Sequence, residues 1–137
     1  MGLQKIIKYI QISKFKDDRG QLSVMEPKEG LPFTIRRLYW ISEVPESESR
    51  AKHGHKELEQ VFICLKGSFS LMISDGLLSE TVLLSENSDA VYVPKAMWRE
   101  LSNFSNSAVC LVLASRNYDP DDYLNSLEDF LNWTSRS

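Results

Sequence analysis

The chain has 137 residues, of which 42% are hydrophobic and 26% charged, as in an ordinary globular protein. Its net charge of −3 gives no bulk basicity that would favour nucleic-acid binding. No apolar run approaches the roughly 20 residues that cross a bilayer, and residues 1–8 lack the apolar core of a signal peptide. Cys64 and Cys110 lie in apolar runs, so we expect buried free thiols in a cytoplasmic protein that binds no membrane.

The first third of the chain reads as short strands and turns. Residues 6–15 alternate loosely between apolar and polar, residues 16–20 form a turn, and residues 22–25 suit a short strand. Residues 33–41 are β-branched and aromatic, which predicts a longer strand. Residues 45–50 are polar and acidic, so we expect a mobile loop there.

The middle of the chain continues in the same manner. Turn signals stand at Asp75-Gly76 and at Glu86-Asn87-Ser88. Strand-like runs lie near residue 53 and at 60–65, 68–74, 80–84, 90–93, 98–103 and 108–114. Short strands at this spacing predict a β-sandwich or a small barrel, with the barrel spanning about residues 1–115 of a single domain.

In the last segment the spacing of apolar residues changes from that of a strand to that of a helix. Asp119 reads as an N-cap, Pro120 as the first helical residue, and Asp121 and Asp122 as acids of the first turn. Apolar residues then recur at helical spacing, which predicts an amphipathic helix over about residues 119–133. Its apolar stripe must dock on the barrel or on a partner.

The chain's only two histidines, His53 and His55, are separated by one residue. On a strand their side chains project from the same face, because successive residues alternate. A pair at this spacing indicates half of a metal site or a pair that handles protons. The alternative is a surface loop with two incidental histidines.

The histidine pair and the residues after it resemble the two motifs of the cupin superfamily. The matching positions are His53, His55, Gln60 and Gly67 in the first motif, and Ser88, Pro94, Ala96, Arg99 and Asn103 in the second. The resemblance implies an all-β cupin jelly roll, here with the C-terminal amphipathic helix.

Two of the four metal-ligand positions of this motif are changed. Gln60 stands where a metal-binding cupin has Glu, and Arg99 stands where it has the third His. A guanidinium has no lone pair to offer a cation, and two imidazoles with one amide bind a divalent metal poorly. We therefore predict a cupin with no metal and no other cofactor.

A narrower resemblance covers roughly residues 15–130. The chain is similar to the sugar 3,4-ketoisomerase family in the strings Asp18-Arg19-Gly20, Ile35-Arg36-Arg37-Leu38-Tyr39, His53-Gly54-His55-Lys56-Glu57-Leu58-Glu59-Gln60, Met97-Trp98-Arg99-Glu100 and Leu113-Ala114-Ser115-Arg116-Asn117-Tyr118-Asp119. The resemblance implies a homodimer that acts on dTDP-4-keto-6-deoxy-D-glucose and serves the synthesis of 3-amino-3,6-dideoxy sugars for surface glycans. Relatives commonly carry Trp-His-Glu where this chain has Trp98-Arg99-Glu100.

Moving a keto group from C4 to C3 requires proton transfers through an enediolate, for which imidazoles are suited near neutral pH. By the resemblance, His53 transfers the carbon-bound proton and His55 moves a proton between the oxygens. Tyr39 is the third predicted catalytic residue, and it shares a strand face with Arg37. The predicted substrate-binding residues are Arg19, Arg37, Gln60, Trp98 and Arg99.

Each of these assignments has a structural alternative. Tyr39 and Trp98 also suit a packed core, while Arg37 and Arg19 also suit a solvated surface. A buried Arg99 requires Glu100, another acid or a bound anion, because an unpaired buried cation is costly.

Two other functions remain open at this point. One is a non-catalytic, metal-free cupin that binds a nucleotide sugar. The other is a related nucleotide-sugar epimerase, which needs a His base opposed by a Tyr acid; a Tyr is present, but no His–Asp pairing is identifiable. The edge formed by residues 6–12 could add to a partner's sheet in the dimer.

Overall fold

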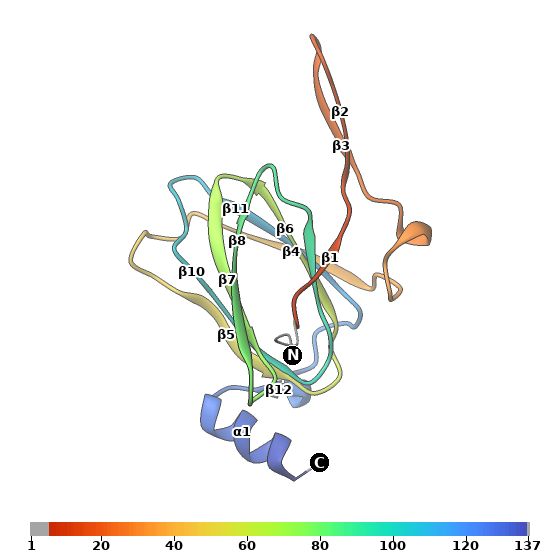
Figure 1. Cartoon of the computed structure of the whole chain (residues 1–137). Coiled ribbons are helices and arrows are strands. Elements are labelled where there is room, and N and C mark those ends of the chain that lie inside the picture. Colours follow the sequence, from red (N-terminus) through yellow and green to blue (C-terminus); the bar gives the residue numbers. More distant parts are fainter. Residues whose placement is uncertain (1–5, 137) are drawn as a thin grey trace, which may run out of the picture.

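A computed structural model describes residues 6–136, which form two facing antiparallel sheets, a separate hairpin and one C-terminal helix (Figure 1). The first sheet has the order β1-β9-β6-β11-β4, with bounds Lys8–Ile10, Ala90–Val93, Gln60–Lys66, Val109–Ala114 and Arg37–Ser42. The second has the order β12-β5-β10-β7-β8, with bounds Tyr123–Leu124, Arg50–His55, Met97–Ser102, Ser68–Ser74 and Ser79–Ser85. The predicted all-β cupin jelly roll with a C-terminal helix is confirmed.

The main core lies between the two sheets. The central strands β6 and β11 are apolar on both faces, since one face meets the second sheet and the other is partly covered by the N-terminal segments. Cys64 and Cys110 are neighbours across β6 and β11, and both are buried free thiols, as predicted. No helix within residues 6–136 is long and apolar enough to span a membrane.

The N-terminal region differs in detail from the sequence-based expectation. The alternating stretch is divided into β1 and β2 (Ser13–Asp17), and β2 pairs with β3 (Gly20–Val24) in a hairpin that projects from the barrel (Figure 1). A short 3₁₀ helix, η1 (Pro27–Glu29), follows. The predicted strand at 33–41 begins only at Arg37, because Phe33 and Ile35 instead pack over the outer face of the first sheet.

The C-terminal helix begins later than predicted. Asp119 does cap a helical turn that starts at Pro120, but this turn is a 3₁₀ helix, η2 (Pro120–Asp122), and the chain then enters β12. The α-helix α1 spans Leu127–Ser135, and the Ser126 side chain caps it by accepting from the Asp129 backbone N–H. The prediction of a continuous helix from 119 was wrong, because Tyr123 and Leu124 pair with the edge of β5.

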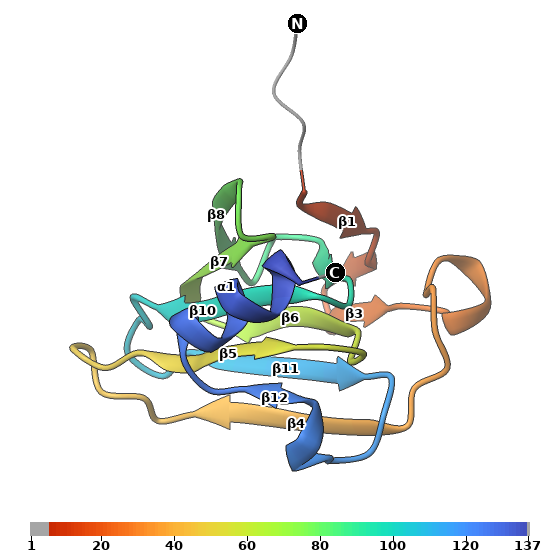
Figure 2. The same ribbon diagram turned by 90° about the horizontal axis from the view of Figure 1, so that it is seen from below.

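Helix α1 lies across the outer face of the sheet that contains β5 and β10 (Figure 2). Phe130 is fully buried there and packs against Trp98 at 6.1 Å between ring centroids. A Cβ atom on Gly54 would stand 2.7 Å from the Phe130 ring, so the helix can pack this closely only because Gly54 has no side chain. The residue between the two histidines therefore serves the packing of α1.

Candidate active site

His53 and His55 project from the same face of β5 into the barrel, as predicted, with ring centroids 6.3 Å apart. The neighbouring strand β10 places Arg99 directly opposite His53 in the ladder. Tyr123 on β12 contacts both rings edge to face, at 5.2 Å from His53 and 4.4 Å from His55. Three strands of the second sheet thus bring the two histidines, a cation and a phenol together.

A polar chain crosses from this sheet to the other. The Arg99 Nη1 group donates to Gln60 Oε1, and Gln60 Nε2 donates to the Tyr39 hydroxyl at 2.9 Å. Because Gln60 supplies the proton in the second contact, the hydroxyl hydrogen of Tyr39 is free to point at a ligand. Burial raises the pKa of Tyr39, so the phenol keeps its proton.

Arg99 is 1% exposed, and none of the ion pairs among the described residues includes it. Glu100, the neighbouring acid, instead accepts a hydrogen bond from the Trp98 indole at 2.9 Å. The Arg99 Nη2 group donates to the Met97 carbonyl at 2.9 Å. Burial lowers the pKa of Arg99 to about 10, which leaves the guanidinium charged at neutral pH.

Three buried side-chain atoms of the described residues have no hydrogen-bond partner, and all three belong to predicted site residues. They are Arg37 Nε, His53 Nδ1 and Arg99 Nε. Buried polar groups in native proteins are nearly always paired, so a concentration of unpaired ones marks a place where a ligand completes the set. Arg37 also lies over the Tyr39 ring, 4.8 Å from its centroid.

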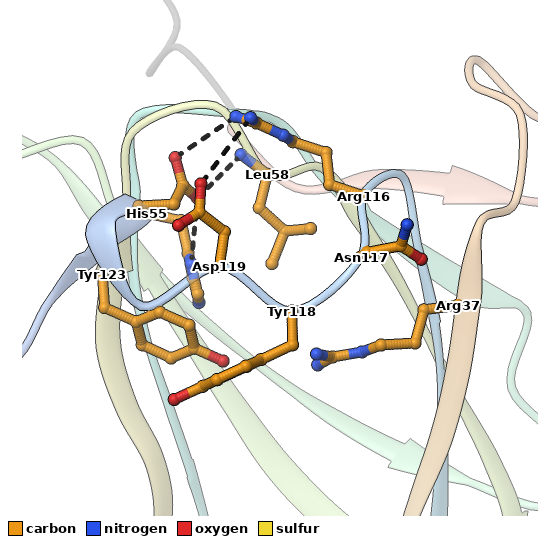
Figure 3. Close-up of a pocket in the computed structure, with 9 residues that line it drawn as sticks. Arg37, His55, Leu58, Arg116, Asn117, Tyr118, Asp119 and Tyr123 are labelled. Carbon is orange, nitrogen blue, oxygen red and sulfur yellow. Dashed lines mark hydrogen bonds and ion pairs between the residues drawn. The ribbon is translucent and has the colours of Figure 1, made fainter.

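A small pocket opens beside His55, lined by the chain that follows β11 (Figure 3). Tyr118 in this loop lies between Arg37 and Tyr123, 5.7 Å from the Arg37 guanidinium carbon and 5.6 Å from the Tyr123 ring. Neither tyrosine was among the predicted site residues, although Tyr118 lies in one of the strings that carry the family resemblance.

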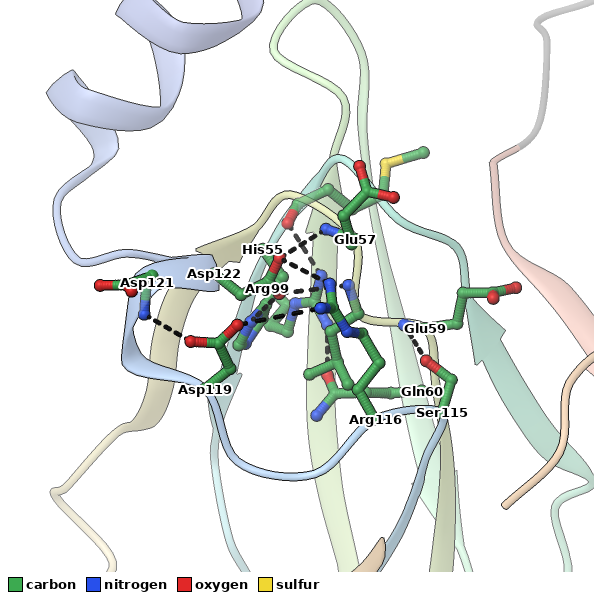
Figure 4. A network of polar contacts seen from close by, with 12 residues as sticks. His55, Glu57, Glu59, Gln60, Arg99, Ser115, Arg116, Asp119, Asp121 and Asp122 are labelled. Carbon is green, nitrogen blue, oxygen red and sulfur yellow. Dashed lines mark hydrogen bonds and ion pairs between the residues drawn. The ribbon is translucent and has the colours of Figure 1, made fainter. Parts of the chain in front are cut away.

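The structure also contains the His–Asp pairing that could not be identified from the sequence. Asp122 is 6% exposed, and its Oδ2 atom is 3.3 Å from Nδ1 of His55 (Figure 4). The acidic cluster at 119–122 was explained locally, as a helix cap and first turn. No local signal indicates that Asp122 turns back towards β5.

Two predicted site residues do not lie beside the histidines. Trp98 is next to Arg99 on β10 and therefore points to the other face, where it is 3% exposed beneath α1, so its predicted stacking on the substrate is corrected to a packing role. Arg19 lies at the turn of the β2–β3 hairpin, 87% exposed and paired with Asp17 at 2.6 Å. The predicted role of Arg19 in substrate binding therefore finds no support at the histidine site of its own chain.

The donor set at the centre of the site does not fit a divalent metal. Within the described part of the chain, no group of three or more His, Cys, Asp and Glu side chains is arranged to hold one. Around the histidines stand an amide and a guanidinium, and the latter repels a cation. Metal independence stays a prediction.

The site environment favours neutral histidines. Burial, followed by the charge of Arg99, lowers the pKa of His53, and the same causes, with smaller contributions from His53 and Arg37, lower the pKa of His55 to about 2. Neutral imidazoles retain a lone pair and can accept protons. The site therefore presents two proton acceptors close to a buried cation.

We predict that His55 takes up no proton between pH 7 and pH 6, where an ordinary histidine with a pKa of about 6.5 titrates, and that the pKa of His53 lies below that ordinary value. Proton NMR can follow both imidazoles individually, because the chain has only two histidines. In the folded protein the ring resonances of His55 should stay constant over this range, and those of His53 should titrate with a midpoint below 6.5. Both sets should move with a midpoint near 6.5 when the protein is unfolded in denaturant. A midpoint at or above 6.5 in the folded protein would contradict this account of the site.

Residues 5–135 match the family model that is described as "FdtA: WxcM-like, C-terminal". The chain is 36% identical over 129 residues to TDP-4-oxo-6-deoxy-alpha-D-glucose-3,4-oxoisomerase from Aneurinibacillus thermoaerophilus, covering 94% of this chain and 93% of that protein. It is 37% identical to the TDP-quinovose 3,4-ketoisomerase WlaRB from Campylobacter jejuni, with a TM-score of 0.86 over 94% of this chain and 99% of the other. It is 30% identical to a His-to-Asn mutant of the 3,4-ketoisomerase QdtA from Thermoanaerobacterium thermosaccharolyticum, whose structure was solved with TDP-4-keto-6-deoxyglucose. The TM-score for this pair is 0.90, and the match covers 98% of this chain and 97% of the other. The chain belongs to the FdtA, WxcM-like family of sugar 3,4-ketoisomerases.

Proposed function

We propose that this chain is an isomerase that moves the keto group from C4 to C3 of dTDP-4-keto-6-deoxy-D-glucose. The observation that carries the proposal is the histidine pair, with His55 buried and His53 half-buried, beside a cation that has no ion-pair partner among the described residues. Proton acceptors next to a fixed positive charge suit a reaction in which a carbon acid loses a proton and an oxyanion develops. The kinship with 3,4-ketoisomerases supports the same conclusion.

In the proposed mechanism His53 removes the proton from C3, and the electron pair of that C–H bond forms the C3–C4 double bond of an enediolate. The former keto oxygen at C4 takes the negative charge. His55 accepts the proton of the C3 hydroxyl and delivers it to the C4 oxygen, while the proton held by His53 returns to C4. The product has the keto group at C3 and a hydroxyl at C4, and no electrons leave the substrate.

Charge and hydrogen bonding support the intermediate. The Arg99 guanidinium has one Nε–H with no partner, and we assign it to the enediolate or to a sugar oxygen next to it. Tyr39, whose hydroxyl accepts from Gln60, donates to a second sugar oxygen. Arg37 also has a buried unpaired Nε–H and is assigned to the same anionic substrate. Preorganised donors of this kind are typically worth 100- to 1,000-fold in rate.

Incubation with the 4-keto sugar nucleotide in the presence of a chelator tests the function and the absence of a metal together. A new 3-keto sugar should form in the wild type. His53→Asn and His55→Asn should each lose about 100- to 10,000-fold in turnover, because Asn fills the space but accepts no proton at neutral pH. Lys52→Asn is the matched control, since Lys52 is exposed on the same strand, and its turnover should equal that of the wild type.

The other outcomes separate the alternatives. An unreacted substrate that nevertheless binds would indicate a non-catalytic cupin. An epimerised 4-keto sugar would indicate an epimerase, a function for which the His55–Asp122 pair and the nearby tyrosines give some physical basis. Turnover retained in both His→Asn variants, or lost on chelation, would defeat the proposed mechanism.

We also propose a homodimer, through the hairpin and the outer face of the first sheet. Phe15 and Leu22 are exposed on the hairpin, while Leu38, Trp40 and Leu65 are exposed on the sheet. A groove of partly apolar character runs between these two surfaces. Exposed apolar area of this extent suits association with a second copy. The proposed contact of Arg19 with substrate then requires its hairpin to reach the partner's site.

For such a dimer, sedimentation should give twice the chain mass of 15.7 kDa at micromolar concentration. Trp40→Glu should favour the monomer, because it puts a charge into the apolar interface. Leu77→Glu is the control, since Leu77 is 95% exposed on the turn between β7 and β8. A wild-type monomer would contradict the proposal.

We place the protein in the cytoplasm, where two buried free thiols remain reduced. Its product would be consumed by amination at C3, as an intermediate for 3-amino-3,6-dideoxy sugars of surface glycans.

A further inference from the structure

Asp122 stands at the end of η2 with its carboxylate buried among N–H donors. Its Oδ1 atom accepts from the backbone N–H of Glu57 at 2.7 Å and lies 3.6 Å from Nη1 of Arg116. Its Oδ2 atom accepts from the backbone N–H of Leu58 at 3.2 Å and faces Nδ1 of His55 at 3.3 Å. The two backbone N–H groups donate to this carboxylate and the Arg116 guanidinium faces it, so the carboxylate acts as an acceptor.

This environment selects one tautomer of His55. A neutral imidazole has one N–H and one lone pair, and an acceptor at Nδ1 favours the form in which Nδ1 carries the hydrogen. The lone pair then lies on Nε2, the ring nitrogen on the other side from Asp122. When Nε2 accepts a proton, the adjacent carboxylate also stabilises the imidazolium that forms.

The backbone around His55 is held by other contacts. His55 pairs with Met97 of β10 and with Tyr123 of β12, and Lys56 N–H donates to the Asp122 backbone carbonyl at 3.1 Å. These interactions position the strand without any use of the Asp122 side chain. The contact between the carboxylate and the ring is therefore available to control the imidazole itself.

We propose that Asp122 is a positioning residue that holds His55 in the Nδ1–H tautomer, so that Nε2 is the atom that exchanges protons with the substrate oxygens. The assignment of Nε2 to the substrate rests on the proposed function. The tautomer itself does not, because it is a property of the free protein.

Nitrogen-15 NMR of the wild-type protein, labelled at its histidines, tests the tautomer directly. The His53→Asn variant leaves one histidine and so assigns the signals. His55 should show a protonated Nδ1 and an unprotonated Nε2 near pH 7. A lone pair on Nδ1 would overturn the proposal, whether or not the enzyme turns over the keto sugar.

Asp122→Asn completes the test, because its amide can donate to Nδ1 and thereby favour the Nε2–H tautomer. We expect His55 to change tautomer and kcat to fall by about 100-fold or more, with a much smaller change in KM. Asp121→Asn is the control, since Asp121 precedes Asp122 in η2 but is exposed and is not among the residues that line the pocket beside His55. Its spectrum and its kcat should match the wild type.

A folded Asp122→Asn protein with the wild-type tautomer and wild-type kcat would overturn the proposal. If this variant does not fold, the wild-type spectrum alone decides the tautomer. If the wild type has no ketoisomerase activity, the proposed function fails, and the tautomer still tests the role of Asp122.

Discussion

The buried guanidinium of Arg99 is the constraint on which the site depends. Its charge lies inside the barrel opposite His53, without an ion-pair partner among the described residues. Burial is the main cause that lowers the pKa of both histidines, and the Arg99 charge lowers both further, which favours their neutral forms. The hydrogen bond from Arg99 to Gln60 also orients the amide that contacts Tyr39. A buried cation of this kind is costly unless an anion accompanies it. In the proposed mechanism the substrate and its enediolate supply that anion.

The fold provides the rigid surroundings that this arrangement requires. The ladder between β5 and β10 sets Arg99 opposite His53, and β12 extends the same sheet so that Tyr123 contacts both imidazoles. Helix α1 then covers the outer face through Phe130, which packs where Gly54 has no side chain. The C-terminal segment is therefore part of the site, although it follows the core strands of the barrel.

Much of the site could be predicted from residue spacing, because alternation along a strand is a local rule. His53 with His55, and Arg37 with Tyr39, share inward faces for this reason. The same rule shows why Trp98 and Arg99 cannot both face the cavity. Asp122 and the start of α1 could not be predicted, because a cap with proline begins a 3₁₀ turn as readily as a helix. The position of Arg19 depends on how far a hairpin projects, which no local pattern specifies.

The most direct test of the account is the kcat/KM of Arg99→Gln with dTDP-4-keto-6-deoxy-D-glucose. Gln can keep a hydrogen bond within the cluster but has no charge. If the buried cation stabilises the enediolate, kcat/KM should fall by about 100- to 1,000-fold, the typical loss for a preorganised donor at a developing oxyanion. A folded Arg99→Gln protein with kcat/KM within a few-fold of the wild type would contradict the account.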